Sequence, residues 1–220
     1  MEDDFKSTLE IKEQSYYETI KSELNFYINK WKLSNLELID DGRESCVLKC
    51  FSDDYGDVIL KKRKTIKVIE DEYNTLIHYD GKRFCKAYDA DKNSGVLLEE
   101  QIKPGAELMK VASLDQRLTI FCSLHKGLHI APSTIEKYPT YLDWVSNASS
   151  YMETRKDHYE LALHMKKAEE ICRELYRLYP TKMLLHGDLH HYNILLNQHN
   201  GYIIIDPKGV IGDPIFDIPR

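Results

Sequence analysis

The stretch "LLHGDLHHYNILL", residues 184–196, places an aspartate, an asparagine and three histidines between two short apolar runs. A further aspartate, Asp206, ends the next apolar run, "YIIID" at residues 202–206. Asn193 follows Asp188 by five positions, and Asp206 follows Asn193 by thirteen. An Asn-Gly pair between the apolar runs favours the positive φ of a tight turn and predicts a β-hairpin. Such a hairpin would fix the distance between Asn193 and Asp206.

These residue types at these spacings are typical of phosphoryl transfer. That reaction requires a hydroxyl group in line with the γ-phosphate of ATP, and cations that neutralise the phosphate oxygens. Asp188 would orient the hydroxyl and accept its proton. The side-chain oxygens of Asn193 and Asp206 are hard ligands of the kind that Mg²⁺ prefers. The alternative is that all three are ordinary turn residues, since Asp and Asn favour turns.

The opening stretch and "IIIDPKGVIGDPIFD" at residues 203–217 together resemble the aminoglycoside phosphotransferase group. The segment "DPKGVIGDP" in particular looks like the streptomycin phosphotransferases and the hydroxyurea-resistance kinases. The resemblance runs from about Leu36 to Asp217. It implies an α+β, two-lobed, protein-kinase-like fold that binds ATP and Mg²⁺ between its lobes.

The N-terminal half has the pattern of a sheet-rich lobe. Residues 5–33 show the apolar periodicity of a leading helix, and residues 36–62 show alternation interrupted by turn chemistry. A helix is predicted at about 68–81, followed by two strands and a turn at about 84–100. We therefore expect a nucleotide-binding lobe over residues 1–101, with an antiparallel sheet and one main helix.

Residues 102–220 are predicted to form a mainly helical catalytic lobe that carries the catalytic loop and the metal-binding β-hairpin. One helix begins at about Tyr141, and the clearest helix runs from Tyr159 to Leu178, ahead of Pro180. In the family that the chain resembles, further helices usually follow "DPIFDIPR" and help to close the acceptor site. We therefore expect this lobe to be truncated at its C-terminus.

By the resemblance, the strand lysine of "VILKK", Lys61, would bind the α- and β-phosphates of ATP, and Glu72 would hold it in place. Two alternatives stay open at this point. Glu70 lies on the same predicted helix as Glu72, and Lys62 or Lys64 in the run "KKRK" can be mistaken for Lys61.

The resemblance also suggests how adenine and the phosphates would be held. Adenine would lie against a hinge at Glu99 to Gln101, where backbone groups form the hydrogen bonds. Gly42, in "DDGRESC", would let the backbone of the first hairpin approach the phosphates, because glycine adopts conformations closed to other residues. One glycine there does not make a diagnostic phosphate loop.

The polar residues around the catalytic loop allow more than one role. A zinc site is disfavoured, because no cysteine is near and "GDLHHYN" is not expected to form the helix that an i, i+4 pair needs. His186 is expected to support the loop, and His190 to contact phosphate or metal-bound water. Asp213 and Asp217 are either acceptor-site carboxylates that attract a cationic sugar, or loop and cap residues.

Composition narrows the class of protein. The 220 residues include 30 basic and 36 acidic side chains, for a net charge of −6, without a basic block. Nucleic acid is therefore a poor partner, and a cationic small molecule a better one. The five cysteines are scattered, which disfavours a disulfide framework. No apolar run approaches the roughly 18 residues of a membrane span, so we expect a cytoplasmic protein and no membrane partner.

We predict an ATP-dependent O-phosphotransferase that acts on a small molecule, with an aminoglycoside such as streptomycin as the leading acceptor and antibiotic resistance as the role. The alternatives are a non-catalytic nucleotide-binding protein or truncated relative, and a kinase of another small metabolite. A protein kinase is disfavoured because no long activation segment follows "IDPKGVIGDP". The sequence does not predict the oligomeric state.

Overall fold

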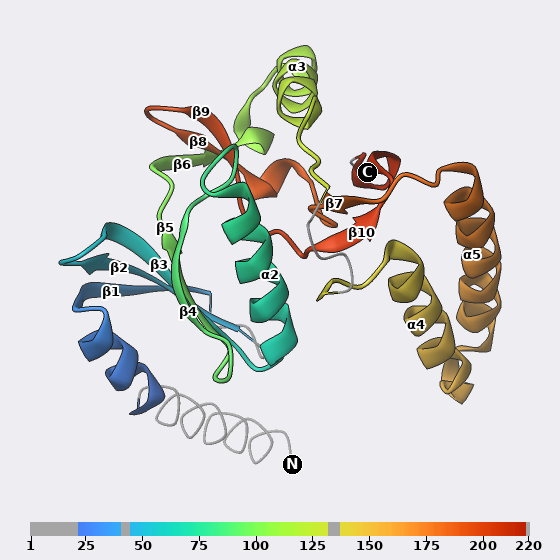
Figure 1. The fold of residues 1–220 in the computed structure, drawn as a ribbon, viewed down its shortest axis with the longest axis horizontal. Helices are drawn as coiled ribbons and strands as arrows, with labels where there is room; N and C mark the ends of the chain where they lie inside the picture. Colours follow the sequence, from blue (N-terminus) through green and yellow to red (C-terminus); the bar gives the residue numbers. More distant parts are fainter. Residues whose placement is uncertain (1–21, 41–44, 132–136, 219–220) are drawn as a thin grey trace, which may run out of the picture.

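The N-terminal part of the protein is built on a five-stranded antiparallel sheet in the order β1-β2-β3-β5-β4 (Figure 1). The structure, a computed structural model, describes residues 22–40, 45–131 and 137–218. The sheet strands are β1 (Leu33–Asp40), β2 (Ser45–Ser52), β3 (Gly56–Arg63), β4 (Ala87–Asp91) and β5 (Val96–Glu100).

The two faces of this sheet have different partners, because side chains alternate along each strand. Val58 and Leu60 of β3 belong to a core that includes residues of the helical segment 22–30. Lys61 directly follows Leu60, so its side chain points to the opposite face of the sheet. There it meets the helix α2 (Ile66–Tyr79). The alternation of the sequence thus separates an apolar face from the face that carries the site.

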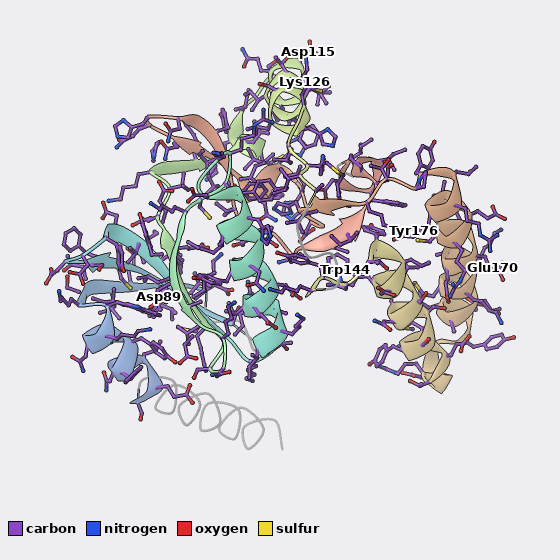
Figure 2. The ribbon with its side chains drawn as sticks, viewed as in Figure 1. Asp89, Asp115, Lys126, Trp144, Glu170 and Tyr176 are labelled. Carbon is purple, nitrogen blue, oxygen red and sulfur yellow. The ribbon has the colours of Figure 1, made fainter. Side chains whose placement is uncertain are left out.

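The leading helix predicted over residues 5–33 is described in its second half, where residues 22–30 are helical; residues 5–21 lie outside the described part. Asp89 of β4 accepts hydrogen bonds from Lys30 Nζ at 2.8 Å and from Trp31 Nε1 at 2.9 Å (Figure 2). Tyr27 stacks on Trp31 with ring centroids 5.1 Å apart. These contacts hold the helical segment against the sheet.

The C-terminal part combines helices with two small sheets. The strands β6 (Pro104–Glu107), β8 (Ile194–Asn197) and β9 (Gly201–Ile204) form one sheet in the order β6-β8-β9, and β7 (Met183–Leu185) pairs with β10 (Val210–Gly212). The helices are α3 (Leu114–His125), α4 (Tyr141–Glu153) and α5 (Tyr159–Leu178). Short 3-10 turns occupy η1 (Leu108–Lys110), η3 (Lys156–His158), η4 (His191–Asn193) and η5 (Pro214–Asp217).

The helices α4 and α5 lie side by side and extend away from the small sheets (Figure 1). The apolar stripe of the sequence from Tyr159 to Leu178 is helical as predicted, but only part of it is covered. Cys172 is buried, whereas Leu161, Ile171 and Leu178 are exposed. Periodicity identified the helix, and it did not determine how much of the apolar face finds a partner.

One apolar core joins the N-terminal sheet and α2 to the small sheets. Leu76 of α2, Leu97 of β5, Ile194 of β8 and Ile204 of β9 are all buried in it. The N–H of Cys85 donates to the carbonyl of Ile204 at 2.9 Å, so the start of the β4 segment is bonded directly to the end of the β8–β9 hairpin. This packing places the Lys61 face of the large sheet against the catalytic loop.

The predicted α+β architecture is confirmed, with an antiparallel sheet and one main helix followed by a part rich in helices. The predicted hairpin is also present: Ile194 pairs with Ile204, and Gly201 at its turn has a φ of +74°. Among the described residues, no helix is both long enough and apolar enough to span a membrane.

Candidate active site

Lys61 is the centre of a buried ion cluster. Its ammonium Nζ lies 2.7 Å from Glu72 Oε1 and 2.7 Å from Glu99 Oε1, and it also contacts Asp206 Oδ1. Lys61, Glu72 and Glu99 are nearly inaccessible, whereas the Asp206 side chain is 26% exposed. The three carboxylates come from α2, from β5 and from the segment after β9, so only the tertiary fold brings them together.

The alternatives that the sequence left open are separated by position. Lys62 points to the other face of β3, where it pairs with Glu23 at 3.0 Å and donates to the carbonyl of Ser94 at 2.6 Å. Glu70 pairs with Lys67 at 3.1 Å in a largely exposed contact. Lys61 and Glu72 are therefore the lysine and glutamate that meet inside the protein.

The ion cluster has three carboxylates for one ammonium, and the pKa values of two of them, Glu99 and Asp206, are shifted in opposite directions. Burial raises the pKa of Glu99, the charge of Lys61 lowers it, and the charges of Glu72 and Asp206 raise it again, so that the net pKa is raised. Burial also raises the pKa of Asp206, but the charge and the hydrogen bond of Lys61 outweigh it and bring that pKa down to about 2. Asp206 is thus favoured as an anion, and Glu99 holds a proton more readily than an exposed glutamate does.

The side chain of Glu99 has a contact that the sequence did not indicate, since the resemblance implied only backbone contacts with adenine at this residue. Glu99 lies in β5, between β3 and β4, so its backbone belongs to the sheet, and its side chain faces Lys61. The thiol of Cys85 lies 3.8 Å from the second carboxylate oxygen of Glu99. The alternation of "VLLEE" already places the side chains of Leu97 and Glu99 on one face of β5. That this face is the one that carries Lys61 follows only from the pairing of Leu97 with Lys61, which depends on the strand order of the sheet.

Of the other residues predicted to bind ATP, Gln101 follows β5, and its N–H donates to the carbonyl of Asp57 at 3.2 Å. A role of the Glu99 to Gln101 backbone toward adenine stays a prediction. Gly42 lies outside the described residues.

The catalytic loop begins at His186, which is fully buried. Its Nδ1 accepts a hydrogen bond from the N–H of Asp188 at 3.0 Å, so the proton is on Nε2, which donates to the carbonyl of Ile205 at 2.8 Å. Burial lowers the pKa of His186, which favours this neutral form. The ring thereby connects Asp188 to the segment that carries Asp206, as the predicted supporting role requires.

Asp217 holds the same loop from the other side. Its carboxylate accepts hydrogen bonds from the N–H groups of His186 and Gly187 at 2.7 and 2.8 Å, and it lies 3.0 Å from His129 Nε2. Burial raises the pKa of Asp217, and these hydrogen bonds lower it to below its ordinary value. Asp213, by contrast, accepts from the N–H of Ile215 at 3.0 Å and begins η5. The carboxylates of Asp213 and Asp217 therefore both accept hydrogen bonds from backbone N–H groups of the protein.

Asn193 and Asp206 flank the open end of the β8–β9 hairpin. Asn193 Nδ2 donates to the carbonyl of Asp188 at 3.0 Å, which orients the amide. No described residue donates a hydrogen bond to Asn193 Oδ1. Asp206, with a φ of +57°, is a non-glycine residue in the left-handed region. An oriented amide oxygen beside a carboxylate of low pKa is a donor set that fits Mg²⁺.

His190 lies between these groups and solvent. Its Nε2 is 3.4 Å from Asn193 Nδ2 and 3.7 Å from Asp188 Oδ1, and its side chain is 40% exposed. The ring therefore lies close to Asp188 and Asn193, and its contact with phosphate or metal-bound water stays a prediction.

A cavity of about 180 Å³ opens beside Asp188. Its lining includes Tyr141 and Phe216, whose rings stack with centroids 4.7 Å apart. Gly187 forms part of the wall at a φ of +83°, where an added Cβ would lie 2.8 Å from the Trp144 side chain. Trp144 belongs to α4 and is labelled in Figure 2. The side chain of Asp188, 48% exposed, is thus accessible to a molecule in this cavity.

A family model described as aminoglycoside/hydroxyurea antibiotic resistance kinase matches residues 30–220. Streptomycin 6-kinase of Streptomyces griseus is 22% identical over 204 residues, which cover 87% of this chain and 62% of the relative. Streptomycin 3''-kinase of Klebsiella pneumoniae is 27% identical over 161 residues, 70% of this chain and 57% of the relative. The chain therefore spans about three-fifths of the length of these curated relatives.

Solved structures share the fold. The streptomycin-ATP-APH(2")-IIa ternary complex matches with a TM-score of 0.62 at 15% identity, over 89% of this chain and 73% of that one. Choline kinase LicA from Streptococcus pneumoniae matches with a TM-score of 0.68 at 15% identity, over 90% of this chain and 72% of that one. At such identity the likeness establishes a kinase-like α+β fold, which confirms the predicted fold class at that level.

Proposed function

The chain belongs to the aminoglycoside/hydroxyurea antibiotic resistance kinase family, and from this membership we propose that it transfers the γ-phosphate of ATP to a hydroxyl group of a cationic small molecule. An aminoglycoside of the streptomycin type is the leading acceptor, because two of the relatives are streptomycin kinases. The observation that carries the proposal is the approach of Lys61 and Asp206, 145 positions apart in sequence, beside the loop of Asp188 and Asn193.

ATP would bind between the N-terminal lobe, residues 1–101, and the C-terminal lobe, residues 102–220. Lys61 would bind the α- and β-phosphates, held by Glu72 at 2.7 Å. The contact of Lys61 with Asp206 would give way to these phosphates. Glu99, as a second carboxyl on the same ammonium, would keep Lys61 in place when that contact is released.

Asn193 and Asp206 would hold Mg²⁺, which neutralises phosphate oxygens when it is bound. Asp188 would orient the acceptor hydroxyl and accept its proton as the oxygen attacks the γ-phosphate. The backbone N–H of Asp188 donates to His186 Nδ1, and its backbone carbonyl accepts from Asn193 Nδ2. These two hydrogen bonds orient the residue and leave its carboxylate oxygens available for the acceptor. Such orientation reduces the entropy lost on the way to the transition state.

The acceptor hydroxyl would enter the cavity beside Asp188. The net charge of −6 and the carboxylate of Asp188 favour a cationic molecule. Asp213 and Asp217 were the other predicted acceptor carboxylates. The hydrogen bonds of Asp217 to His186 and Gly187 favour a structural role for it, and Asp213 is not among the residues that line this cavity.

The size of the cavity favours a second candidate, a kinase of a compact cationic alcohol. About 180 Å³ is small for a drug-sized ligand, for which pockets of roughly 300–1,000 Å³ are usual. Tyr141 and Phe216 in the lining suit a compact cation, since aromatic faces attract cations. Turnover with small amino alcohols and none with aminoglycosides would identify this candidate.

The experiment is an ATP-consumption assay with a panel of streptomycin, other aminoglycosides and small amino alcohols, combined with ATP-binding measurements. Asp188→Asn should lower kcat by about 10² to 10⁴-fold, the contribution of a general base, while the Kd for ATP changes little. Asp213→Asn is the matched control, because it alters a carboxylate at the edge of the same loop region. ATP binding without turnover of any acceptor would favour the non-catalytic alternative, and full activity of Asp188→Asn would refute the role of Asp188.

A further inference from the structure

Asp217 accepts hydrogen bonds from three donors, and only two of them belong to the catalytic loop. The backbone N–H groups of His186 and Gly187 donate to its two carboxylate oxygens at 2.7 and 2.8 Å. The third donor is the side chain of His129, whose Nε2 lies 3.0 Å from Asp217 Oδ2. The side chains of Asp217 and His129 are almost completely buried, with exposures of 1% and 5%. The proposed transfer uses no atom of His129, so this histidine can act on it only through Asp217.

The proton between these two side chains lies on His129. An ionised carboxylate has no proton to donate, so His129 Nε2 carries the hydrogen and donates it to Asp217. Burial raises the pKa of Asp217, and the hydrogen bond from His129 is the largest contribution that lowers it. His129 thus helps to keep Asp217 ionised, and in that form both carboxylate oxygens accept from the N–H groups of the loop.

The backbone around His129 is fixed on both sides. It follows α3, which ends at His125, and the neighbouring Leu128 is buried in the core. On the other side, the carbonyl of Ile130 accepts from the N–H of Leu184 at 2.8 Å, in β7, the strand that leads into the catalytic loop. The ring of His125 meets that of His129 edge to face, with centroids 4.9 Å apart. The donor to Asp217 is therefore held in place independently of the loop.

Asp217 connects His129 to both sides of the proposed reaction. The N–H of His186 donates to Asp217, and the ring of His186 in turn accepts from the N–H of Asp188 at 3.0 Å. Asp217 and its neighbour Phe216 also line the cavity beside Asp188. One buried carboxylate thus fixes the loop of the proposed general base and a wall of the acceptor cavity.

We infer that His129 is a positioning residue for the phosphoryl transfer and sets the place of Asp188 through Asp217. The inference rests on the proposed function and adds to it a residue that touches neither reactant. Without the Nε2–H, the buried Asp217 carboxylate loses one of its donors and shifts toward those that remain, and the loop moves with it. A displacement of a catalytic group by about 1 Å can lower a rate by about 10²-fold, so a small movement is sufficient.

The activity test compares His129→Leu with His129→Gln in the ATP-consumption assay. Leucine removes the donor, whereas glutamine carries an amide N–H that can replace Nε2–H. His129→Leu should lower kcat by about 10 to 10²-fold and leave KM for ATP and for the acceptor within about twofold, because the binding contacts are unchanged. His129→Gln should recover most of the loss. Wild-type kcat in the leucine variant, or equal losses in the two variants, would overturn the inference.

A double-mutant cycle tests whether His129 acts through Asp217. His129→Leu combined with Asp217→Asn should lower kcat no further than Asp217→Asn alone, because residues in one hydrogen-bonded unit are not additive. Gly127→Ala is the matched control, since it strains the same segment while the added Cβ meets no atom within 4 Å, and it should leave kcat unchanged. Losses that multiply in the double variant, or a loss in Gly127→Ala as large as in His129→Leu, would contradict the inference.

Hydrogen exchange tests the positioning in the absence of any acceptor. In His129→Leu the backbone N–H groups of His186 and Gly187 should exchange about tenfold faster than in the wild type. The N–H of Leu184, which is bonded to Ile130, should keep its rate. Unchanged exchange in the loop, or an equal acceleration at Leu184, would overturn the inference. Faster exchange in the loop of a protein whose wild type phosphorylates no acceptor would instead refute the proposed function.

Discussion

At Lys61 one ammonium is shared by the carboxyl groups of Glu72, Glu99 and Asp206. Glu99 is 2% exposed and lies 2.7 Å from Lys61 Nζ, so ionising it adds a second or third buried carboxylate around a single cation. Its pKa is therefore raised in the folded protein, first by burial and then by the neighbouring carboxylates. A carboxyl that binds its proton more tightly when folded makes stability depend on pH.

The first prediction at this scale concerns that dependence. A raised folded-state pKa means that the folded protein binds more protons than the unfolded chain above the unfolded value of 4.5, so the free energy of unfolding falls as pH rises from there. Between pH 5 and pH 8, the free energy of unfolding of the wild type should fall by more than about 1 kcal/mol relative to that of Glu99→Gln, since one pKa unit corresponds to about 1.4 kcal/mol.

Urea denaturation of both proteins at several pH values measures this difference. Histidine titration contributes to both proteins and cancels in the comparison. Parallel pH profiles for the two would show that Glu99 titrates as it does in the unfolded chain.

The catalytic loop is an element held at its ends by buried hydrogen bonds. Asp217 accepts from the N–H groups of His186 and Gly187 with separate oxygens. Asp217→Asn replaces one of these oxygens by a donor, which leaves a buried N–H unsatisfied at a cost of about 1–3 kcal/mol. We expect a lower midpoint of urea denaturation and a reduced kcat, because Asp188 follows directly.

The control for this loop is Asp213→Asn. Asp213 is the cap of η5, and asparagine serves as a helix cap about as well as aspartate, so stability should change by less than about 0.5 kcal/mol. A loss of stability as large as that of Asp217→Asn would show that the two aspartates support the region equally.

The segment after Asp206 is held against α2 at a single glycine. Gly209 has a φ of +66°, and an added Cβ would lie 2.3 Å from Thr75 Oγ1. Gly209→Ala should therefore lower the free energy of unfolding by about 3 kcal/mol, from overpacking together with left-handed strain. Because Glu72 belongs to the same helix, ATP affinity should fall as well.

Gly127→Ala separates the two contributions to that effect. Gly127 has a φ of +67°, but an added Cβ would meet no atom within 4 Å. Gly127→Ala should therefore lower the free energy of unfolding only by the strain of a left-handed backbone, about 1 kcal/mol. Equal effects at the two glycines would mean that the contact with α2 is unimportant.

At the scale of the whole molecule, ligands join parts that are distant in sequence. Lys61 and Glu72 come from the large sheet and α2, and Asn193 and Asp206 from the β8–β9 region, so a nucleotide with Mg²⁺ would bridge them. ATP with Mg²⁺ at a concentration of about 100 times its Kd should raise the free energy of unfolding by about 2.7 kcal/mol and Tm by roughly 5–10 °C.

Differential scanning fluorimetry tests this, with EDTA to remove the metal. Mg²⁺ alone should change Tm little, and Asp206→Ala should abolish the additional shift that Mg²⁺ gives to ATP. If chelation leaves the shift by ATP intact in wild type, Mg²⁺ is not bound at Asp206 and Asn193.

The sequence by itself determined the features that depend on local pattern. The β8–β9 hairpin that separates Asn193 from Asp206 forms as predicted, with a short loop at residues 198–200 that ends at Gly201, because a short hairpin loop leaves the backbone few conformations. Alternation along β3 likewise places Lys61 and Lys62 on opposite faces of the sheet, as the structure has them. These relations involve neighbours along the chain or across one turn, where backbone geometry leaves little choice.

Only the tertiary structure decided the rest, because those contacts depend on strand order and on the packing of separate elements. Glu99 reaches Lys61 since β5 lies beside β3, and Asp217 reaches the catalytic loop across 31 positions of sequence. The partly uncovered apolar face of α5 has the same origin: periodicity identifies the side that can be buried, and the neighbouring elements determine how much of it is.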